Sequence, residues 1–236
     1  MNLIILFESD FTHFDIAQLE DRRFQHITSI HKPEIGQNLK VGLLNGQIGY
    51  GEVLKLDSSS VTLRVSLERN PPQALPLTLL LGLPRPKMLK RVLQTVSTMG
   101  VKELYLINSY RVDKSYWGSP VLEKQINEHL LLGLEQAGDT VMPNIHLRKR
   151  FKPFVEDELP AISQGSRSLV AHPYNASTCP ETANIKTTLA IGPEGGFIDY
   201  EVEKLNQCGF DSIHIGERIL RVETAVPALL SRLFPV

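Results

Sequence analysis

The sequence contains almost no cysteine, which excludes a disulfide-stapled fold. Cys179 and Cys208 are its two cysteines, and they form neither a closely spaced pair nor part of a known metal-ligand spacing. Isolated thiols of this kind predict a reducing compartment. Long apolar runs are missing as well, because no stretch reaches membrane-spanning length and the amino end lacks a charged-then-apolar leader. We therefore expect a cytoplasmic protein with no metal and no membrane partner.

An excess of positive charge is also missing. The 236 residues include 25 basic and 26 acidic side chains, for a net charge of −1. Net charge therefore does not predict a nucleic-acid partner, and any RNA contact must come from a local basic patch. Hydrophobic residues make up 42% and charged residues 22% of the chain, which is typical of a globular protein with one or two domains.

The phosphate-binding patterns G-x-x-x-x-G-K-S/T and G-x-G-x-x-G are absent. Two other glycine-bearing stretches lie near the carboxyl end, and each has a short apolar run, a glycine, charged residues and a helical pattern. The first is a predicted strand at 188–191 followed by GPEGGF at 192–197. The second is a predicted strand at 212–215 followed by GERILRVETA at 216–225. Since ligands bind at the strand ends of open α/β sheets, these stretches predict one shared pocket.

Helix signals follow each of the two stretches. Asp199 is the expected cap of one helix, and Thr224 is the expected cap of a final helix that reaches residue 234. Pro227 is expected in the first turn of that final helix, where proline is tolerated. Either glycine turn alone is typical of an ordinary strand-to-helix connection. The occurrence of both, with the two arginines and two glutamates that lie between apolar positions in the second stretch, favours a binding site.

The first 70 residues predict an all-β unit, and the rest of the chain predicts an α/β unit. Short strands with tight turns favour a small barrel, with Asn45-Gly46 as a two-residue hairpin turn and residues 68–72 as a linker. From residue 75 the pattern alternates between strand and helix. This alternation predicts a largely parallel sheet with helices on both faces.

Two segments combine positive charge with features suited to RNA. The segment 108–119 interleaves aromatic rings with cations, which suit unpaired bases and phosphates. A loop that folds its rings back onto the protein is an equal alternative. The Arg-Lys-Arg cluster at 148–150 is typical of a solvated edge, and it also suits phosphate.

The sequences GPEGGF and IGERILRVETA, at 192–197 and 215–225, resemble the signature of the RsmE family. That family methylates N3 of a uridine in small-subunit (16S) ribosomal RNA with S-adenosylmethionine. The resemblance implies a PUA-like, RNA-binding β-barrel at 1–72 and a SPOUT-type α/β methyltransferase domain at 73–236, with a trefoil knot at about 169–236. It also implies a homodimer whose partner is ribosomal RNA or the small ribosomal subunit.

The resemblance assigns the cofactor to the loops at three strand ends, of which the first begins with a His-Pro element. Apolar edges are expected to hold the adenine, and glycine amides are expected to bind its edge and the ribose. The implied S-adenosylmethionine residues are His172, Pro173, Leu189, Ile191, Gly192, Pro193, Gly195, Gly196, Ile215, Gly216, Ile219, Leu220, Arg221, Thr224 and Ala225.

Methylation at uracil N3 requires loss of a proton and stabilisation of the resulting anion. Arg221 is the first candidate for this stabilisation. Glu223 or Glu194 is the candidate for accepting the proton or orienting the arginine. A helix N-terminal charge is an equal alternative for Glu223. The expected RNA contacts are Lys32, Lys87, Arg111 and Lys114.

The sequence departs from the family at two positions. Lys32 stands where the family usually has arginine, so the charge is kept and the bidentate fork is lost. Asp139 follows an element that the family often continues with arginine, which reverses a charge expected to face RNA. These departures support an alternative, an RNA-binding SPOUT-like protein with a different or lost methylation target. A third hypothesis, a glycine-loop enzyme for phosphorylated small molecules, is disfavoured by the missing phosphate-loop lysine and metal-ligand spacing.

Overall fold

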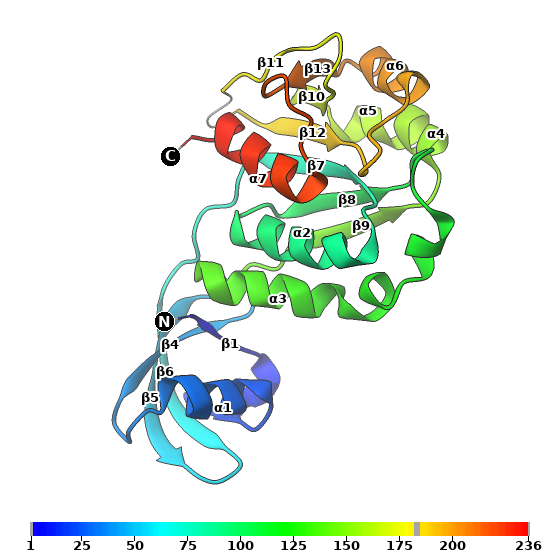
Figure 1. Cartoon of the computed structure of the whole chain (residues 1–236). Helices are drawn as coiled ribbons and strands as arrows, with labels where there is room; N and C mark the ends of the chain where they lie inside the picture. Colours follow the sequence, from blue (N-terminus) through cyan, green and yellow to red (C-terminus); the bar gives the residue numbers. More distant parts are fainter. Residues whose placement is uncertain (1, 182–184, 236) are drawn as a thin grey trace. The chain divides into compact units, whose positions relative to one another are not determined.

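The computed structural model describes residues 2–181 and 185–235, which form two compact units (Figure 1). Unit 1 contains the chain up to Gln73 and the segment Leu134–Met142, and unit 2 contains Ala74–Gly133 and the chain from Pro143 onward. The sequence predicted a single boundary near residue 72 and did not predict that a later segment belongs to unit 1.

Unit 1 is built on a six-stranded sheet in the order β1-β4-β5-β6-β3-β2. The β1–β4 pair is parallel and the other pairs are antiparallel. Alternating apolar residues of these strands form its core, which includes Leu39, Val41, Val61 and Leu63. The strands are β1 (Ile4–Leu6), β2 (Phe11–His13), β3 (Ile16–Leu19), β4 (Asn38–Leu43), β5 (Ile48–Leu56) and β6 (Val61–Arg69).

The expectation of an all-β first unit was wrong for residues 22–31. A short helix α1 (Arg22–His26) continues into a π-helical turn η2 (Ile27–His31), and a 3-10 turn η1 (Glu8–Asp10) follows β1. Asp21 caps α1 by accepting a hydrogen bond from the Arg23 amide at 2.8 Å. Ile27 is fully buried in the unit 1 core. One cap and one buried side chain are too weak a pattern to predict a helix this short.

The predicted hairpin at β4 and β5 is present, but its turn is not a two-residue Asn-Gly turn. Leu43 donates a backbone hydrogen bond to Gln47, and Asn45 takes the left-handed conformation with a φ of 59°. The returning segment explains the longer loop, because the Asn45 amide donates to Thr140 and the Asn45 carboxamide oxygen accepts from the Met142 amide. Such tertiary bonds cannot be anticipated from the local Asn-Gly signal.

Asp139 does not offer a reversed charge to RNA, which corrects the interpretation drawn from the sequence. Its side chain is 3% exposed, and its Oδ1 accepts a hydrogen bond from the Val141 amide at 2.9 Å. The residue is therefore a turn-forming aspartate of the returning segment. This removes one of the two departures that supported a lost methylation function.

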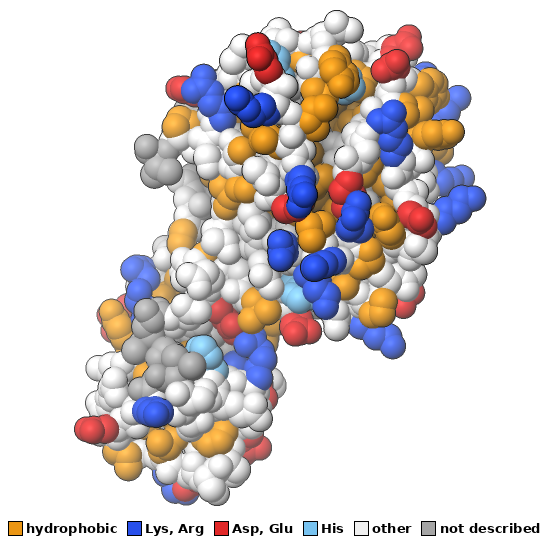
Figure 2. All heavy atoms as spheres, viewed as in Figure 1, with side chains coloured by type: hydrophobic (Ala, Val, Ile, Leu, Met, Phe, Trp, Pro, Cys, Tyr) orange, Lys and Arg blue, Asp and Glu red, His pale blue; other side chains and the backbone are white. Residues whose placement is uncertain are grey.

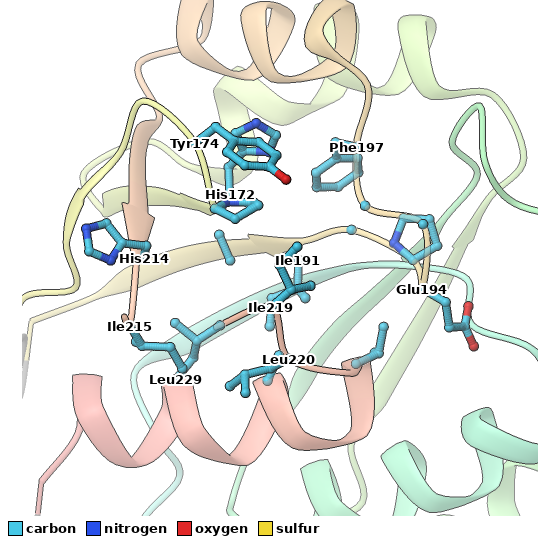
Figure 3. Close-up of a pocket in the computed structure, with 18 of the residues that line it drawn as sticks. His172, Tyr174, Ile191, Glu194, Phe197, His214, Ile215, Ile219, Leu220 and Leu229 are labelled. Atoms are coloured by element: carbon cyan, nitrogen blue, oxygen red, sulfur yellow. The ribbon is translucent and has the colours of Figure 1, made fainter. Parts of the chain in front are cut away.

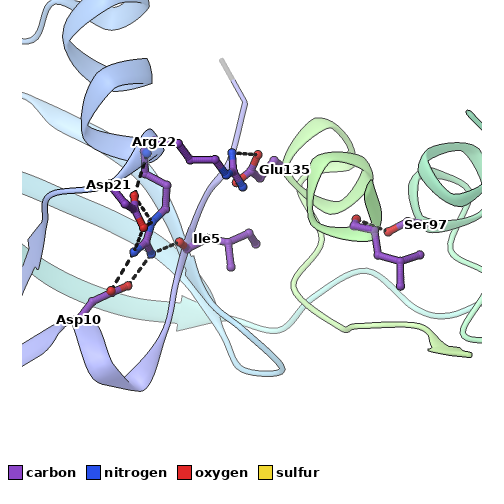
Figure 4. A network of polar contacts seen from close by, with 8 residues as sticks. Ile5, Asp10, Asp21, Arg22, Ser97 and Glu135 are labelled. Atoms are coloured by element: carbon purple, nitrogen blue, oxygen red, sulfur yellow. Dashed lines mark hydrogen bonds and ion pairs between the residues drawn. The ribbon is translucent and has the colours of Figure 1, made fainter. Parts of the chain in front are cut away.

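A buried arginine joins three elements of unit 1 (Figure 4). Arg23 is 6% exposed and donates to both carboxylates of Asp10 and Asp21 and to the Ile5 carbonyl. Burial alone lowers the pKa of Arg23, but the hydrogen bonds to the two carboxylates raise it above its ordinary value. Arg22 forms a separate pair with Glu135 at 2.8 Å, which fixes the returning segment.

Unit 2 contains a seven-stranded, entirely parallel sheet in the order β11-β13-β10-β12-β7-β8-β9. The prediction of a largely parallel sheet is confirmed. The strands are β7 (Leu77–Gly82), β8 (Glu103–Ile107), β9 (Asn144–Arg148), β10 (Arg167–Ala171), β11 (Ser177–Thr178), β12 (Thr187–Ile191) and β13 (Asp211–His214).

Helices cover both faces of this sheet (Figure 1). One face carries α2, α3 and α7, and the opposite core contains Phe154, Val155 and Leu159 packed with Val202 and Leu205. The helical segments are α2 (Pro86–Thr98), η3 (Lys114–Gly118), η4 (Val121–Gln125), α3 (Ile126–Ala137), α4 (Phe151–Pro153), η5 (Phe154–Glu158), α5 (Leu159–Ile162), α6 (Asp199–Gln207) and α7 (Val222–Leu233).

Two predicted helix caps were misplaced. Asp199 is the first residue of α6, and Ile198 holds the cap position. Arg221 holds the cap position of α7, so Thr224 lies inside the helix and Pro227 lies beyond its first turn. Both helices begin earlier than their best capping residue indicates, because buried residues such as Val222 extend the helical stripe.

Candidate active site

A pocket of about 410 Å³ lies at the carboxyl ends of β10, β12 and β13. These strands are neighbours in the order β13-β10-β12, so their three outgoing loops meet at one edge of the sheet. The volume lies within the roughly 300–1,000 Å³ of small-molecule sites. The two glycine stretches therefore do build one pocket, as predicted.

The glycine loop after β12 is folded too tightly at Gly192 to accept a side chain. A Cβ on Gly192 would lie 2.7 Å from the Phe197 amide nitrogen and 2.9 Å from the Gly196 carbonyl carbon. Gly196 has a φ of 73°, in the left-handed region that favours glycine. Its amide donates to the Pro193 carbonyl at 2.7 Å, which closes the turn. The backbone of this loop, at Gly192, Gly195 and Gly196, therefore lines the pocket.

Apolar side chains form the rest of the wall (Figure 3). Ile191 and Ile219 lie in the middle of the view, and Leu220 and Leu229 lie toward α7. Ile219 is 73% exposed. An exposed large apolar side chain at a pocket rim is typical of a surface that a ligand or partner covers.

Glu194 belongs to the pocket lining, but its carboxylate does not point into the pocket (Figure 3). Its side chain points away toward the turn before α2 (Figure 3). There its Oε1 accepts from the Arg85 amide at 3.0 Å and lies 3.3 Å from the Arg85 guanidinium. The carboxylate therefore connects the glycine loop to the segment after β7. Because Glu194 was a candidate base, its ion pair with Arg85 makes the carboxylate less available to accept a proton.

The segment 108–119 is attached to the same loop. The Arg111 guanidinium donates to the Gly195 carbonyl, and its stem lies where a Cβ on Gly195 would be. The buried Glu201 accepts from the Tyr110 amide at 2.7 Å and from the Ile198 amide at 3.1 Å. Burial raises the pKa of Glu201, while these two amide bonds lower it. Glu201 was not predicted as a site residue. The available signal was its position three residues after the helix cap Ile198, where a glutamate commonly binds the backbone amide of the cap residue.

His172 follows β10 and lines the pocket beside Tyr174, with the two rings 5.7 Å apart in an edge-on arrangement. Burial lowers the pKa of His172 below 6.5; the nearby Asp199 acts in the opposite direction and Arg111 in the same direction. The imidazole is therefore neutral at pH 7. A neutral ring on the pocket wall avoids repelling a cationic ligand.

The lowered pKa of His172 predicts an acid-sensitive stability. Below the ordinary value of about 6.5 the unfolded chain binds a proton that the folded chain resists, so the free energy of unfolding should fall as the pH drops. Above that value the contribution is constant. Replacing His172 by glutamine should flatten this part of the profile, measured by denaturant unfolding between about pH 7.5 and pH 5. The exposed His13→Gln is the control, and identical profiles for wild type and His172→Gln would contradict the assignment.

The second stretch contributes mainly apolar residues and backbone. Arg221 is exposed and holds the cap position of α7 between two pocket residues, Leu220 and Val222, but it does not itself line the pocket. Within the described residues, its side chain has no hydrogen bond or ion pair. Glu223 is partly buried in the first turn of α7. Both charged groups therefore lie at the rim.

Most residues assigned to the cofactor from the sequence line the pocket, and three do not. Leu189 is fully buried in the middle of β12 and is not part of the lining. Arg221 and Thr224 lie outside the lining. The predicted residues that do line it are His172, Pro173, Ile191, Gly192, Pro193, Gly195, Gly196, Ile215, Gly216, Ile219, Leu220 and Ala225.

Several lining residues were missed by the sequence prediction. His214 ends β13, and its Nδ1 accepts from the Gly216 amide at 3.1 Å. For Tyr174, Phe197 and Arg218, the available signal was a position in the loop that follows a predicted strand. The missed lining residues are Ala171, Tyr174, Phe197, Asp199, Ile213, His214, Arg218, Val222 and Leu229.

The four predicted RNA contacts are spread over the chain. Arg111 lines the pocket, whereas Lys87 lies in the first turn of α2 and Lys114 opens η3. Lys32 is exposed in unit 1, where it ends η2 with a φ of 43°. The three in unit 2 follow β7, which is next to β12 in the sheet, or β8, which lies beyond β7.

Residues 71–234 match the family model described as an RNA methyltransferase domain. A Treponema pallidum protein named ribosomal RNA small subunit methyltransferase E is 28% identical over 235 residues, covering 97% of this chain and 88% of the relative. The chain belongs to the RsmE family of RNA methyltransferases. A second relative, named ribosomal RNA small subunit methyltransferase E 1, comes from Borreliella burgdorferi; it is 25% identical over 233 residues, covering 97% of this chain and 95% of the relative.

The fold is also that of a solved RsmE-family structure. The crystal structure of ribosomal RNA small subunit methyltransferase E from Neisseria gonorrhoeae, bound to S-adenosyl methionine, superposes with a TM-score of 0.80 at 18% identity. The match covers 98% of this chain and 95% of that chain. At this identity the likeness concerns the fold.

Within residues 2–181 and 185–235, no group of three or more His, Cys, Asp or Glu side chains is arranged to hold a metal ion. In the same ranges, no helix combines the length and apolar character needed to cross a membrane.

Proposed function

We propose that this protein transfers the methyl group of S-adenosylmethionine to N3 of a specific uridine in small-subunit (16S) ribosomal RNA. The observation that carries the proposal is the pocket at the ends of β10, β12 and β13, built by the two motifs that mark the RsmE family. The names of the relatives supply the substrate class.

The pocket suits a nucleoside-containing methyl donor. Its apolar walls at Ile191, Ile219 and Leu229 match the faces of an adenine. The Gly192–Gly196 loop lines the pocket with backbone, and backbone groups of this loop can bind the adenine edge and ribose. When bound, the cofactor supplies an electrophilic methyl group. The protein residues hold it, exclude water and align the acceptor nitrogen.

The rim residues supply the chemistry at the acceptor. Arg221 stabilises the negative charge that develops on the uracil oxygens as the N3 proton leaves. Glu223, two residues further along in the first turn of α7, accepts that proton or orients Arg221. Glu194 is the less suitable base, because Arg85 already engages its carboxylate. Its role is to hold the glycine loop against the end of β7.

RNA is held by cations at the edge of the pocket and beyond it. Lys and Arg side chains gather over α2 and the start of α7 (Figure 2). Lys87, Arg111 and Lys114 supply contacts from unit 2, and Lys32 supplies one from unit 1. A PUA-like RNA-binding role for the unit 1 sheet is part of the same proposal. A near-neutral protein can bind RNA in this way because the charges are local.

The proposed architecture completes this assignment. We propose that the chain from about residue 169 to 236 is threaded as a trefoil knot; of this range, 182–184 and 236 lie outside the described residues. The return of β13 to the far side of β10 supports it. We also propose a homodimer that covers the exposed Ile219 and Leu220, and a cytoplasmic location beside the small ribosomal subunit.

Tritiated methyl transfer to undermethylated small-subunit RNA tests the function. The expected product, identified by mass spectrometry of the nucleosides, is 3-methyluridine from a single site. Methylation of another base or position would overturn the assigned target. Binding of RNA without binding of S-adenosylmethionine would instead support a protein that has lost catalysis.

A further inference from the structure

All strands of unit 2 run in the same direction, so every outgoing loop lies at one edge of the sheet. Along this edge the strands stand in the order β12, β7, β8, β9. Arg85 and Lys87 follow β7, Lys114 follows β8, and Lys149 and Arg150 follow β9. The sequence predicted RNA contacts after β7 and β8 and left the 148–150 cluster undecided.

The cations at the β8–β9 end of this edge are available to bind phosphates. Lys114, Lys149 and Arg150 are exposed, and within the described residues none of them forms an ion pair. The neighbouring Arg148 differs, because its Nε donates to Glu158 at 2.7 Å. Unpaired, exposed cations are the groups that can neutralise phosphates and release counterions.

The structure brings the aromatic segment and the basic cluster together. The Asn108 amide donates to the Arg148 carbonyl at 2.8 Å, and the Trp117 indole donates to the Asn108 side chain at 3.0 Å. Lys149 lies over the Trp117 ring, with Nζ 5.8 Å from its centroid. A partly exposed aromatic ring beside exposed cations is the combination that binds single-stranded RNA.

The same segment reaches the pocket at its other end. Arg111 donates to the Gly195 carbonyl of the glycine loop, while Trp117 contacts the basic cluster after β9. Three strand spacings separate β12 from β9, which corresponds to about 14 Å. The segment 108–119 therefore connects the proposed methylation site with a second cationic surface a short distance along the sheet edge.

We infer that Trp117, Lys149 and Arg150 form a second anchoring site for the RNA, which holds the single strand that leaves the pocket. The cations bind the phosphates of that strand, and the indole ring supports one of its bases. This inference rests on the proposed function, since it concerns the path of the same RNA. It assigns a role to the 148–150 cluster that is separate from cofactor binding and from catalysis.

The test compares two double variants that each remove two positive charges. Lys149→Ala/Arg150→Ala changes the carboxyl edge of the sheet, and the control Lys102→Ala/Lys186→Ala changes residues just before β8 and β12, at the amino edge. Undermethylated small-subunit RNA and the shortest RNA fragment that the wild type still methylates are the two probes. Affinity is measured by filter binding over a range of salt concentrations, and kcat and KM are measured by methyl transfer.

For the long RNA we expect the Lys149→Ala/Arg150→Ala variant to raise Kd and KM about 10-fold with kcat unchanged, and to lower the log Kd–log salt slope by about 1.4. The control variant should match the wild type. For the shortest fragment, both variants should have the Kd and KM of the wild type. Unchanged affinity for the long RNA, or an equal loss on the shortest fragment, would overturn the inference. If the wild type binds RNA but methylates none, the proposed function is refuted. The anchoring site is still tested in that case, because filter binding measures the affinity of each variant for RNA without methyl transfer.

Discussion

Replacing Arg221 by alanine is expected to lower kcat for methyl transfer about 100- to 1,000-fold, the usual cost of removing one stabilising group from a developing oxyanion. Affinity for S-adenosylmethionine should stay within a few-fold, because Arg221 lies outside the pocket lining. Folding should also be intact, since the side chain is exposed. Single-turnover transfer at saturating RNA and cofactor measures the chemical step, and calorimetric titration measures cofactor affinity.

Two companion variants separate charge from geometry. Arg221→Lys keeps the charge and loses the planar fork, so it should recover only part of the rate if the arginine contacts a uracil oxygen in a defined orientation. Arg232→Ala removes an arginine from the other end of α7, where it pairs with Glu181 on the surface, and should leave the rate unchanged. A kcat for Arg221→Ala within a few-fold of wild type would remove Arg221 from catalysis.

The sequence predicted the pocket because its signals are local. Glycine and proline patterns act within a few residues, and a short apolar run before Gly192 or Gly216 predicts a strand end directly. Parallel strand ends meet at one edge of a sheet, so two such signals are enough to predict a common site. The apolar walls at Ile191, Ile219 and Leu220 followed from the same two stretches.

The contacts that fix the loops could not be predicted in the same way. Glu194 binds Arg85, which is 109 residues away, and Glu201 binds the amide of Tyr110, which is 91 residues away. A single sequence does not show such long-range pairings. From sequence alone, either carboxylate could equally be exposed to solvent or interact with the N-terminus of a helix. For the same reason the Leu134–Met142 return and the burial of Asp139 became visible only in the fold.

The glycine loop provides the sharpest test of the cofactor site. Gly192→Ala is expected to weaken S-adenosylmethionine binding about 100-fold, or about 2.7 kcal/mol. The new Cβ would lie 2.7 Å from the Phe197 nitrogen and 3.0 Å from the Gly196 Cα, and backbone atoms cannot yield as a flexible side chain does. The loop must therefore open, which displaces Phe197 and the loop backbone that lines the pocket.

A matched glycine distinguishes this steric effect from a general loss of flexibility. A Cβ on Gly118 meets nothing within 4 Å, so Gly118→Ala should bind the cofactor as the wild type does. Calorimetric titration of both variants, with denaturant unfolding to confirm that each is folded, gives the comparison. If folded Gly192→Ala binds S-adenosylmethionine with wild-type affinity, the loop does not hold the cofactor. The methyl donor would then have to reach N3 from another surface, and the proposed catalytic role of Arg221 at the rim of this pocket would no longer be supported.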